Sequence, residues 1–136
     1  MNLEIQTGRR LVKAIFFVSA ALLFFFVGWN EGWADVSETQ KPEVQHLLAY
    51  LKNSGCQMER NGSMHDAQEA VEHIQKKYDY YKDDIKTTED FIERSASRSS
   101  LSGRAYHLLC PGEDARPTAD WLKEELERYR KEQAGS

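Results

Sequence analysis

The sequence predicts an α+β domain that is mostly helical, with about four helices packed around a two-stranded antiparallel ribbon and one disulfide bond. Three observations predict this class. After residue 42, apolar residues recur every three or four positions in several segments, which is the spacing of one helix face. Two short segments, 56–60 and 104–110, alternate apolar and polar residues as strands do. Each of these two segments contains one of the two cysteines.

The composition describes a chain of moderate size and mild acidity. It has 136 residues, with 22 acidic and 18 basic side chains and a net charge of −4. Nucleic-acid-binding proteins gather Lys and Arg against phosphates, and no basic stripe of that kind is present. Nor is there a polybasic cluster suited to anionic lipids. We therefore expect no nucleic-acid partner, and contact with a membrane only through the N-terminal segment.

Residues 1–34 have the pattern of a secretory signal peptide. A basic flank at 9–13 precedes an uncharged apolar run at 14–29, as in such signals. Gly32 and Ala34 supply the small residues that cleavage after position 34 requires. We therefore predict an exported, periplasmic domain.

The alternative for this segment is an uncleaved membrane anchor over residues 11–29. As a helix it would be roughly 28 Å long, close to the thickness of a bilayer core. The domain would then still lie in the periplasm, held at the inner membrane. The run is slightly long for a signal peptide, yet the sequence favours cleavage.

Cys56 and Cys110 are the only cysteines, so each has one possible partner in the chain. In an oxidising compartment such a pair is typically a disulfide, not a metal site or a nucleophile. The two are far apart in sequence, unlike the Cys-x-x-Cys arrangement of redox-active sites. We predict a structural disulfide that contributes roughly 4 kcal/mol by closing a loop of about 55 residues.

The mature chain is predicted to consist of a polar lead-in at 35–41, one disulfide-linked domain at 42–132 and a disordered tail at 133–136. The first helix begins near Pro42, because proline suits the first turn, and it ends at Gly55. Its apolar face consists of Val44, Leu47, Leu48 and Leu51.

The second helix is predicted to follow the turn Asn61-Gly62, with Ser63 as its N-cap and a frayed end near Asp83. Its apolar face consists of Ala67, Ala70, Val71, Ile74, Tyr78 and Tyr81. A short third helix, capped by Thr88, dissolves into the serine-rich segment 95–103. Its apolar face consists of Phe91, Ile92 and Ala96.

The last helix is predicted to begin at Thr118 as its N-cap. Its buried face consists of Trp121, Leu122, Leu126 and Tyr129. If Cys56 faces Cys110 and the strands are antiparallel, Arg60 lies opposite Tyr106. That register would bring the Asn61-Gly62 turn close to the serine-rich segment.

The serine-rich segment is the most suggestive candidate site. Its hydroxyls and flanking guanidinium groups could bind an anion or a glycan carboxylate. The alternative, which is favoured, is a polar loop whose serines satisfy the backbone. Neither Gly-x-Ser-x-Gly nor Ser-x-x-Lys is present, so a serine nucleophile has little support. The residues concerned are Ser95, Ser97, Ser99, Ser100 and Ser102, with Arg94, Arg98 and Arg104.

Other polar groups give weaker signals. His65, Glu69 and His73 lie on one helix face, but the two histidines would be roughly 12 Å apart, too far to share an ion. A solvated face is the favoured interpretation, and we expect no metal and no cofactor. Among the aromatic residues of the second helix, Tyr80 is the one expected to be exposed.

Several short stretches together resemble one family. They are Ser54-Gly55-Cys56, Arg60-Asn61-Gly62-Ser63, Asp90-Phe91-Ile92-Glu93-Arg94, the run from Ser97 to Gly103, Tyr106 with Cys110, Trp121-Leu122, Leu126 and Tyr129-Arg130. They resemble the YfeK-like proteins, small exported proteobacterial proteins grouped as a domain of unknown function (5329). The resemblance covers roughly residues 42–131 and implies a periplasmic location and the pairing of the two cysteines. It implies no established activity, so it transfers no catalytic residue.

The sequence therefore predicts a non-enzymatic periplasmic binding or adaptor module. Its ligand is unknown, and we expect it to be anionic, derived from the cell envelope or a segment of an envelope protein. The alternatives are a membrane-tethered accessory subunit and, with less support, an envelope hydrolase that uses a serine with His107 as base. No catalytic residue is predicted. The predicted ligand-binding residues are Arg60, Asn61, Arg94, Ser99, Ser100, Ser102 and Arg104.

Overall fold

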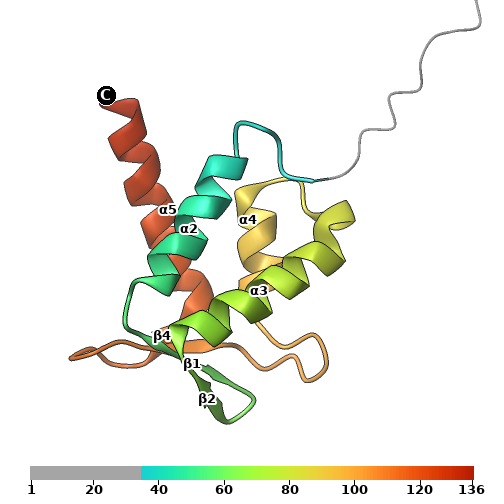
Figure 1. Cartoon of the computed structure of the whole chain (residues 1–136), viewed down its shortest axis with the longest axis vertical. Coiled ribbons are helices and arrows are strands. Elements are labelled where there is room, and N and C mark those ends of the chain that lie inside the picture. The colour runs from blue at the N-terminus through green and yellow to red at the C-terminus, as the bar shows by residue number, and fades with distance from the viewer. Residues whose placement is uncertain (1–34) are drawn as a thin grey trace, which may run out of the picture. The chain divides into compact units, whose positions relative to one another are not determined.

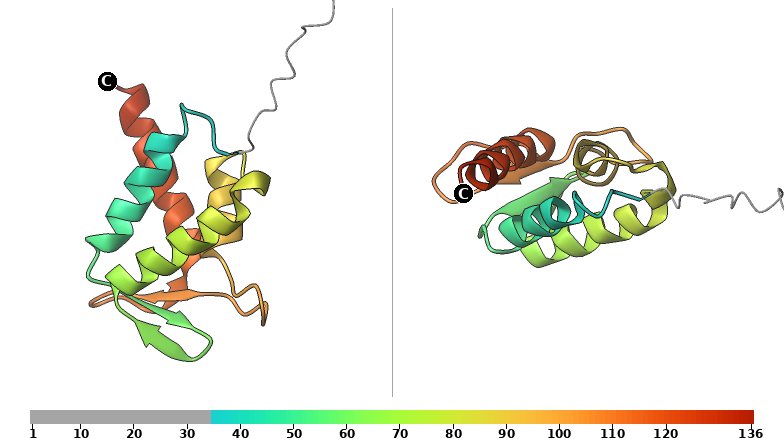
Figure 2. Two further views of the ribbon diagram at one scale, coloured as in Figure 1. Left: turned by 45° about the vertical axis from the view of Figure 1, so that its right-hand side comes forward. Right: turned by 90° about the horizontal axis from the view of Figure 1, so that it is seen from above.

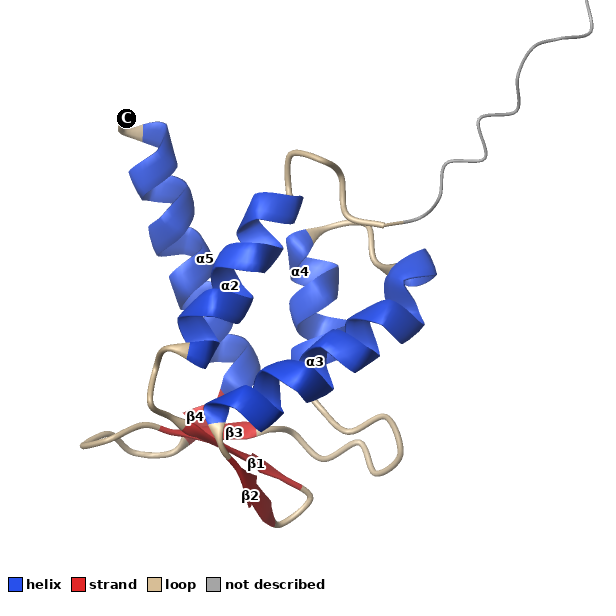
Figure 3. Ribbon diagram, in the orientation of Figure 1, coloured by secondary structure: helices blue, strands red, loops and turns tan. Residues whose placement is uncertain are grey.

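In the computed structural model of the protein, the four helices of the described part lie on one side of a four-stranded antiparallel sheet (Figures 1 and 3). The structure describes residues 35–136. The predicted signal peptide at 1–34 and the alternative anchor at 11–29 lie outside the described residues. No helix in the described part is both long enough and apolar enough to span a bilayer.

The described elements follow one another in a simple order. The helices are α2 (Lys41–Lys52), α3 (Ala67–Tyr81), α4 (Thr88–Phe91) and α5 (Thr118–Ala134). A 3₁₀ turn, η1 (Lys82–Asp84), follows α3, and a π-helical turn, η2 (Ile92–Ala96), continues α4. The strands are β1 (Gln57–Arg60), β2 (Ser63–His65), β3 (His107–Leu109) and β4 (Arg116–Pro117), in the sheet order β2-β1-β3-β4.

The predicted ribbon forms the centre of this sheet. β1 and β3 are antiparallel, with Gln57 opposite Leu109 and Met58 opposite Leu108. This register continues to Cys56 opposite Cys110, as the sequence predicted. The prediction of two strands was wrong, because β2 and β4 flank the ribbon. Both are too short to show a reliable alternation of apolar and polar residues.

The turn between β1 and β2 is a two-residue hairpin. Asn61 has φ +52° and Gly62 has φ +84°, and positive φ at both central residues is typical of tight antiparallel hairpins. Ser63 is therefore the first residue of β2, and the prediction that it caps a helix was wrong. Asp66 caps α3 instead, in a capping box with Glu69.

The remaining helix ends differ from the predictions by short distances. Thr87, not Thr88, caps α4, and Asp90 completes its capping box. Pro117 occupies the N-cap position of α5, so Thr118 begins the helix without capping it. At the other end α5 continues through Ala134, into the segment that was predicted to be disordered.

The core lies between the helices and the inner face of the sheet. α2 lies beside α3 and α5 (Figure 2). α3 packs against η2, the turn that continues α4. The predicted apolar faces are buried at Val44, Leu47, Leu51, Ala70, Ile74, Phe91, Ile92, Ala96, Trp121, Leu122 and Leu126. Each fully buried Val, Leu, Ile or Phe side chain among them contributes about 1.5–3 kcal/mol. Because this core lies within residues 36–126, the described part contains its own core.

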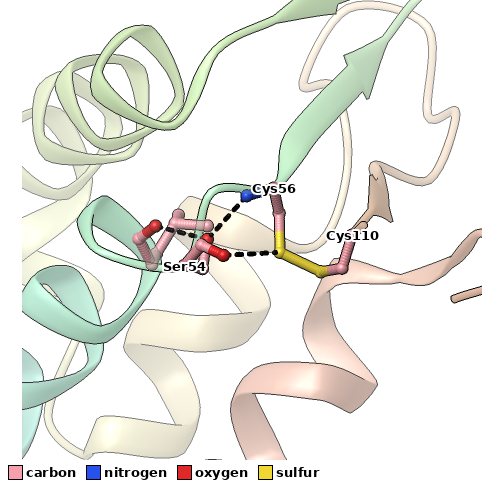
Figure 4. The surroundings of a disulfide bond; sticks show 4 residues. Ser54, Cys56 and Cys110 are labelled. Carbon is pink, nitrogen blue, oxygen red and sulfur yellow. Dashed lines mark hydrogen bonds between the residues drawn. A yellow bond between two sulfur atoms is a disulfide. The ribbon is translucent and has the colours of Figure 1, made fainter. Parts of the chain in front are cut away.

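The disulfide joins the start of β1 to the end of β3 (Figure 4). Cys56 is bonded to Cys110, and its N–H donates to the Ser54 hydroxyl at 3.1 Å. The same hydroxyl donates to the carbonyl oxygen of Leu51 at 2.7 Å, so it also closes the end of α2. The predicted disulfide is confirmed.

Candidate functional site

A pocket of about 590 Å³ opens between α3, the α4–η2 segment and the loop at 97–106. A volume of this size lies within the ordinary range of small-ligand pockets. Three of the predicted ligand-binding residues are on its wall. The wall consists of Lys77, Tyr81, Asp90, Glu93, Arg94, Arg98, Ser99, Ser100 and Gly103.

The loop at 97–106, which forms one side of the pocket, is folded on itself. Its two arms are joined because the N–H of Ser99 donates to the carbonyl of Arg104, and the N–H of Tyr106 to that of Ser97, both at 2.9 Å. The N–H of Gly103 donates back to the carbonyl of Ser99, also at 2.9 Å. The positive φ of Gly103 (+71°) suits this tight return.

The Asn61 side chain fastens this loop to the β1–β2 turn. Its amide nitrogen donates to the Ser99 hydroxyl at 3.3 Å, and its oxygen accepts from the Ser102 hydroxyl at 2.6 Å. The oxygen of Ser99 also accepts the N–H groups of Leu101 and Ser102. The turn and the serine-rich segment therefore meet, and Asn61, Ser99 and Ser102 hold the loop in shape.

Lys77 brings an ammonium group to the pocket from the buried side of α3. Only 8% of the residue is exposed. Its Nζ donates to the carbonyl oxygen of Arg98 at 2.5 Å and lies 5.2 Å from the centre of the Tyr106 ring. No ion pair between Lys77 and a carboxylate occurs in residues 35–136. Burial, and then the positive charge of Arg60, lower the pKa of Lys77.

Sequence reasoning missed Lys77, although a signal was present. Ala70, Ile74 and Tyr81 belong to the predicted apolar face of the helix, and position 77 lies on the same face by the three- and four-residue spacing. A lysine in the middle of an apolar helix stripe departs from the usual pattern. Such a position could have been selected as a candidate from the sequence.

The positive charge of Arg60 acts on both Lys77 and His73. The hydroxyl of Tyr106, a residue that is 1% exposed, makes a hydrogen bond with Nε2 of His73 at 3.0 Å. Burial, followed by the charges of Arg60 and Lys77, lowers the pKa of His73 to about 4. His73 is therefore neutral at neutral pH. Arg60, like Lys77, has no carboxylate within ion-pair distance among the described residues.

The acidic side chains on the pocket wall are already engaged. Glu93 pairs with Arg98 at 3.0 Å. Asp90 accepts the N–H groups of Lys86 and Thr87, and hydrogen bonding to the Lys86 backbone lowers its pKa. Asp84, outside the wall, lies 3.8 Å from Arg94. The ammonium of Lys77 is thus the positive charge on the wall that these carboxylates leave uncompensated.

The predicted ligand-binding residues divide into three groups. Arg94, Ser99 and Ser100 are on the pocket wall. Asn61 and Ser102 hold the loop, while Arg104 is exposed and contributes its backbone to the loop. The remaining residue, Arg60, is half-buried and close enough to Lys77 and His73 to lower their pKa values.

The histidines, which were weaker candidates in the sequence, are not on the pocket wall. Residues 35–136 contain no cluster of three metal-ligating side chains. His65 faces Glu69 at 3.4 Å, whereas His73 faces Tyr106. His107 lies 3.7 Å from Glu59 on the sheet, and no hydrogen bond of the described part joins it to a serine.

Fold and site together define a small disulfide-linked α+β domain with a polar pocket, whose wall carries three cations and two carboxylates. Residues 38–130 match a family of unknown function (DUF5329), and the chain belongs to this family. It is 33% identical over 75 residues to the "Uncharacterized protein YfeK" of Salmonella typhimurium (strain LT2). That alignment covers 54% of this chain and 62% of the relative, so it spans less than two thirds of the relative's length. No solved structure matches. The resemblance to YfeK-like proteins is confirmed.

Proposed function

We propose that the protein is a periplasmic, non-enzymatic binding module that holds a small anion in the pocket between α3, η2 and the loop at 97–106. The observation that carries this proposal is Lys77. A buried ammonium group without a carboxylate is costly, because its hydration is lost and no opposite charge replaces it. A bound carboxylate or phosphate would supply that charge.

The surroundings of Lys77 support an anionic ligand. The guanidinium groups of Arg94 and Arg98 are on the same wall and can form charge-assisted hydrogen bonds. The hydroxyl of Ser100, an exposed residue on the wall, is a further donor. Since Glu93 and Asp90 already have partners, they oppose the binding of an anion less than free carboxylates would.

The periplasmic location rests on separate observations. The basic flank and apolar run at 9–29 have the pattern of an export signal, which supports this location. A disulfide within the domain is typical of an oxidising compartment. Anions available there include inorganic phosphate and the carboxylates of cell-wall fragments.

The test is the thermal stability of residues 35–136, the part with its own core, with and without inorganic phosphate or N-acetylmuramic acid. We expect at least one of these anions to raise the melting temperature, as a ligand that binds only the folded state does. Lys77→Met should abolish the increase. Lys76→Met removes the same charge from an exposed neighbour and should preserve it.

Two results would overturn the proposal. One is that neither inorganic phosphate nor N-acetylmuramic acid raises the melting temperature of the unmutated protein. The other is an equal increase in the Lys77→Met and Lys76→Met variants, because the anion would then bind elsewhere.

A further inference from the structure

Two strongly exposed apolar side chains adjoin the pocket. Leu101 is 100% exposed and lies in the loop between Ser100 and Gly103, both of which are on the pocket wall. Tyr80 is 79% exposed, and its ring packs edge-on against Tyr81 of the wall, with 4.7 Å between ring centres. They are the two most exposed large apolar residues in the described part of the chain.

The exposed Leu101 lies in a loop that hydrogen bonds hold in place. The Leu101 N–H donates to the Ser99 hydroxyl oxygen, which in turn accepts from Asn61. Ser102 is fastened to Asn61 as well. The loop therefore presents a leucine to solvent at a defined place beside the cations, although the hydrophobic effect favours burial of such a side chain.

We infer that the anion is the headgroup of an anionic phospholipid in a bilayer, with Leu101 inserted among the lipid chains. This inference rests on the proposed function and names its ligand class. A phosphate on Lys77, Arg94 and Arg98 would lie at headgroup depth. Leu101 would then find an apolar environment, and Tyr80 would lie at the interface, where tyrosine is enriched in membrane proteins.

Within the pocket, the charge complementary to a phosphate is that of Lys77, because Glu93 pairs with Arg98 and Asp84 with Arg94. The chain as a whole has a net charge of −4, so anionic lipid does not attract it in general. The wall brings together cations from positions 77, 94 and 98, beside the carboxylates of Asp90 and Glu93, so no polybasic cluster is visible in the sequence. Binding should therefore depend on the phosphate site and on Leu101 together.

The test is sedimentation of residues 35–136 with vesicles of phosphatidylglycerol and phosphatidylcholine in equal parts, compared with vesicles of phosphatidylcholine alone. We expect binding to the anionic vesicles only. Leu101→Ser should weaken it by roughly tenfold or more, because an inserted leucine is lost. Leu109→Ser changes a leucine that is 39% exposed on β3 and is the matched control.

The variants separate this inference from the proposed function. Leu101→Ser should leave the stabilisation by soluble anions intact. Lys77→Met should abolish both this stabilisation and the binding to anionic vesicles. If soluble anions stabilise the protein but anionic vesicles do not bind it, the inference is wrong and the proposed function stands. The inference would also be overturned if Leu101→Ser and Leu109→Ser weakened binding to anionic vesicles equally. If neither anions nor vesicles bind, both proposals fail.

Discussion

Lys77 and His73 lie one helical turn apart on α3, and both have lowered pKa values. Burial is the first cause for each, and the positive charge of Arg60 is the second. In both cases the surroundings disfavour the protonated form. The free energy of unfolding should therefore depend on pH through these two residues.

For His73 the dependence lies in the acidic range. The unfolded chain takes up this proton near pH 6.5 and the folded protein only near 4. As pH falls through this window, the unfolded state gains protons first, so the free energy of unfolding decreases. His73→Gln should remove this part of the decrease. Urea denaturation of the unmutated protein and of His73→Gln, at neutral pH and near pH 4, measures the two free energies of unfolding. The same pH dependence in both proteins would contradict the role given to His73.

For Lys77 the sign works in the alkaline range. The pKa of Lys77 is lowered from 10.5 in the folded protein, so the unfolded chain binds this proton more tightly. The charged form therefore destabilises the fold at neutral pH, and this loss disappears as pH rises through the alkaline range. Lys77→Met replaces the buried charge with an apolar side chain of similar length. We expect the free energy of unfolding without ligand to stay the same or to rise, as for other buried charges. Chemical denaturation at neutral pH measures this free energy, and a variant less stable than the unmutated protein would contradict the expectation.

At the scale of elements, the β1–β2 turn and the loop at 97–106 are linked through one side chain. Asn61 has a positive φ and also bonds to Ser99 and Ser102. The two roles can be separated by substitution. Glycine keeps the backbone conformation but loses the hydrogen bonds, whereas alanine loses both.

We expect Asn61→Gly to cost about 1 kcal/mol or more through the lost hydrogen bonds. Asn61→Ala should cost more, because alanine at positive φ adds strain of about 1 kcal/mol or more. Both variants should speed amide hydrogen exchange at residues 99–103. Unchanged exchange in the loop would show that Asn61 does not fasten it.

The elements that the sequence predicted well are those with a repeated pattern. The apolar faces of α2, α3 and α5 follow helical spacing over several turns, and the β1–β3 register follows from a disulfide that fixes one pair of residues. The start of β2 was missed although Asn61-Gly62 is a strong hairpin signal. Ser63 had two plausible roles, and the three-residue strand that it begins gives no alternation to decide between them.

The site was predicted only in part, for a physical reason. The serine-rich segment and Arg94 were selected by their composition, and part of that segment does form a wall of the pocket. Lys77 was not selected, because its importance depends on burial beside Tyr106 and the Arg98 carbonyl, which only the tertiary structure determines. The π-helical turn was not predicted either, and the buried Ser95 hydroxyl within it has no hydrogen-bond partner in the described part.

At the scale of the whole molecule, the disulfide links residues that are 54 positions apart. In the chain-entropy estimate, closing such a loop contributes about 4 kcal/mol. We expect the Cys56→Ala, Cys110→Ala double variant to lose stability of about that size, with the same fold. Urea denaturation of the oxidised protein, the reduced protein and the double variant would measure the loss. A reduced protein as stable as the oxidised one would contradict this role.

Cys56, Cys110 and the chain between them form a covalent ring that includes the fully exposed Leu101. Exposed loop tips are preferred sites of proteolysis. A single cut beside Leu101 would open this ring without separating the chain into two molecules. A cut protein would still migrate as one species until a reductant released the pieces. Damage at the most accessible point would therefore leave the domain in one piece.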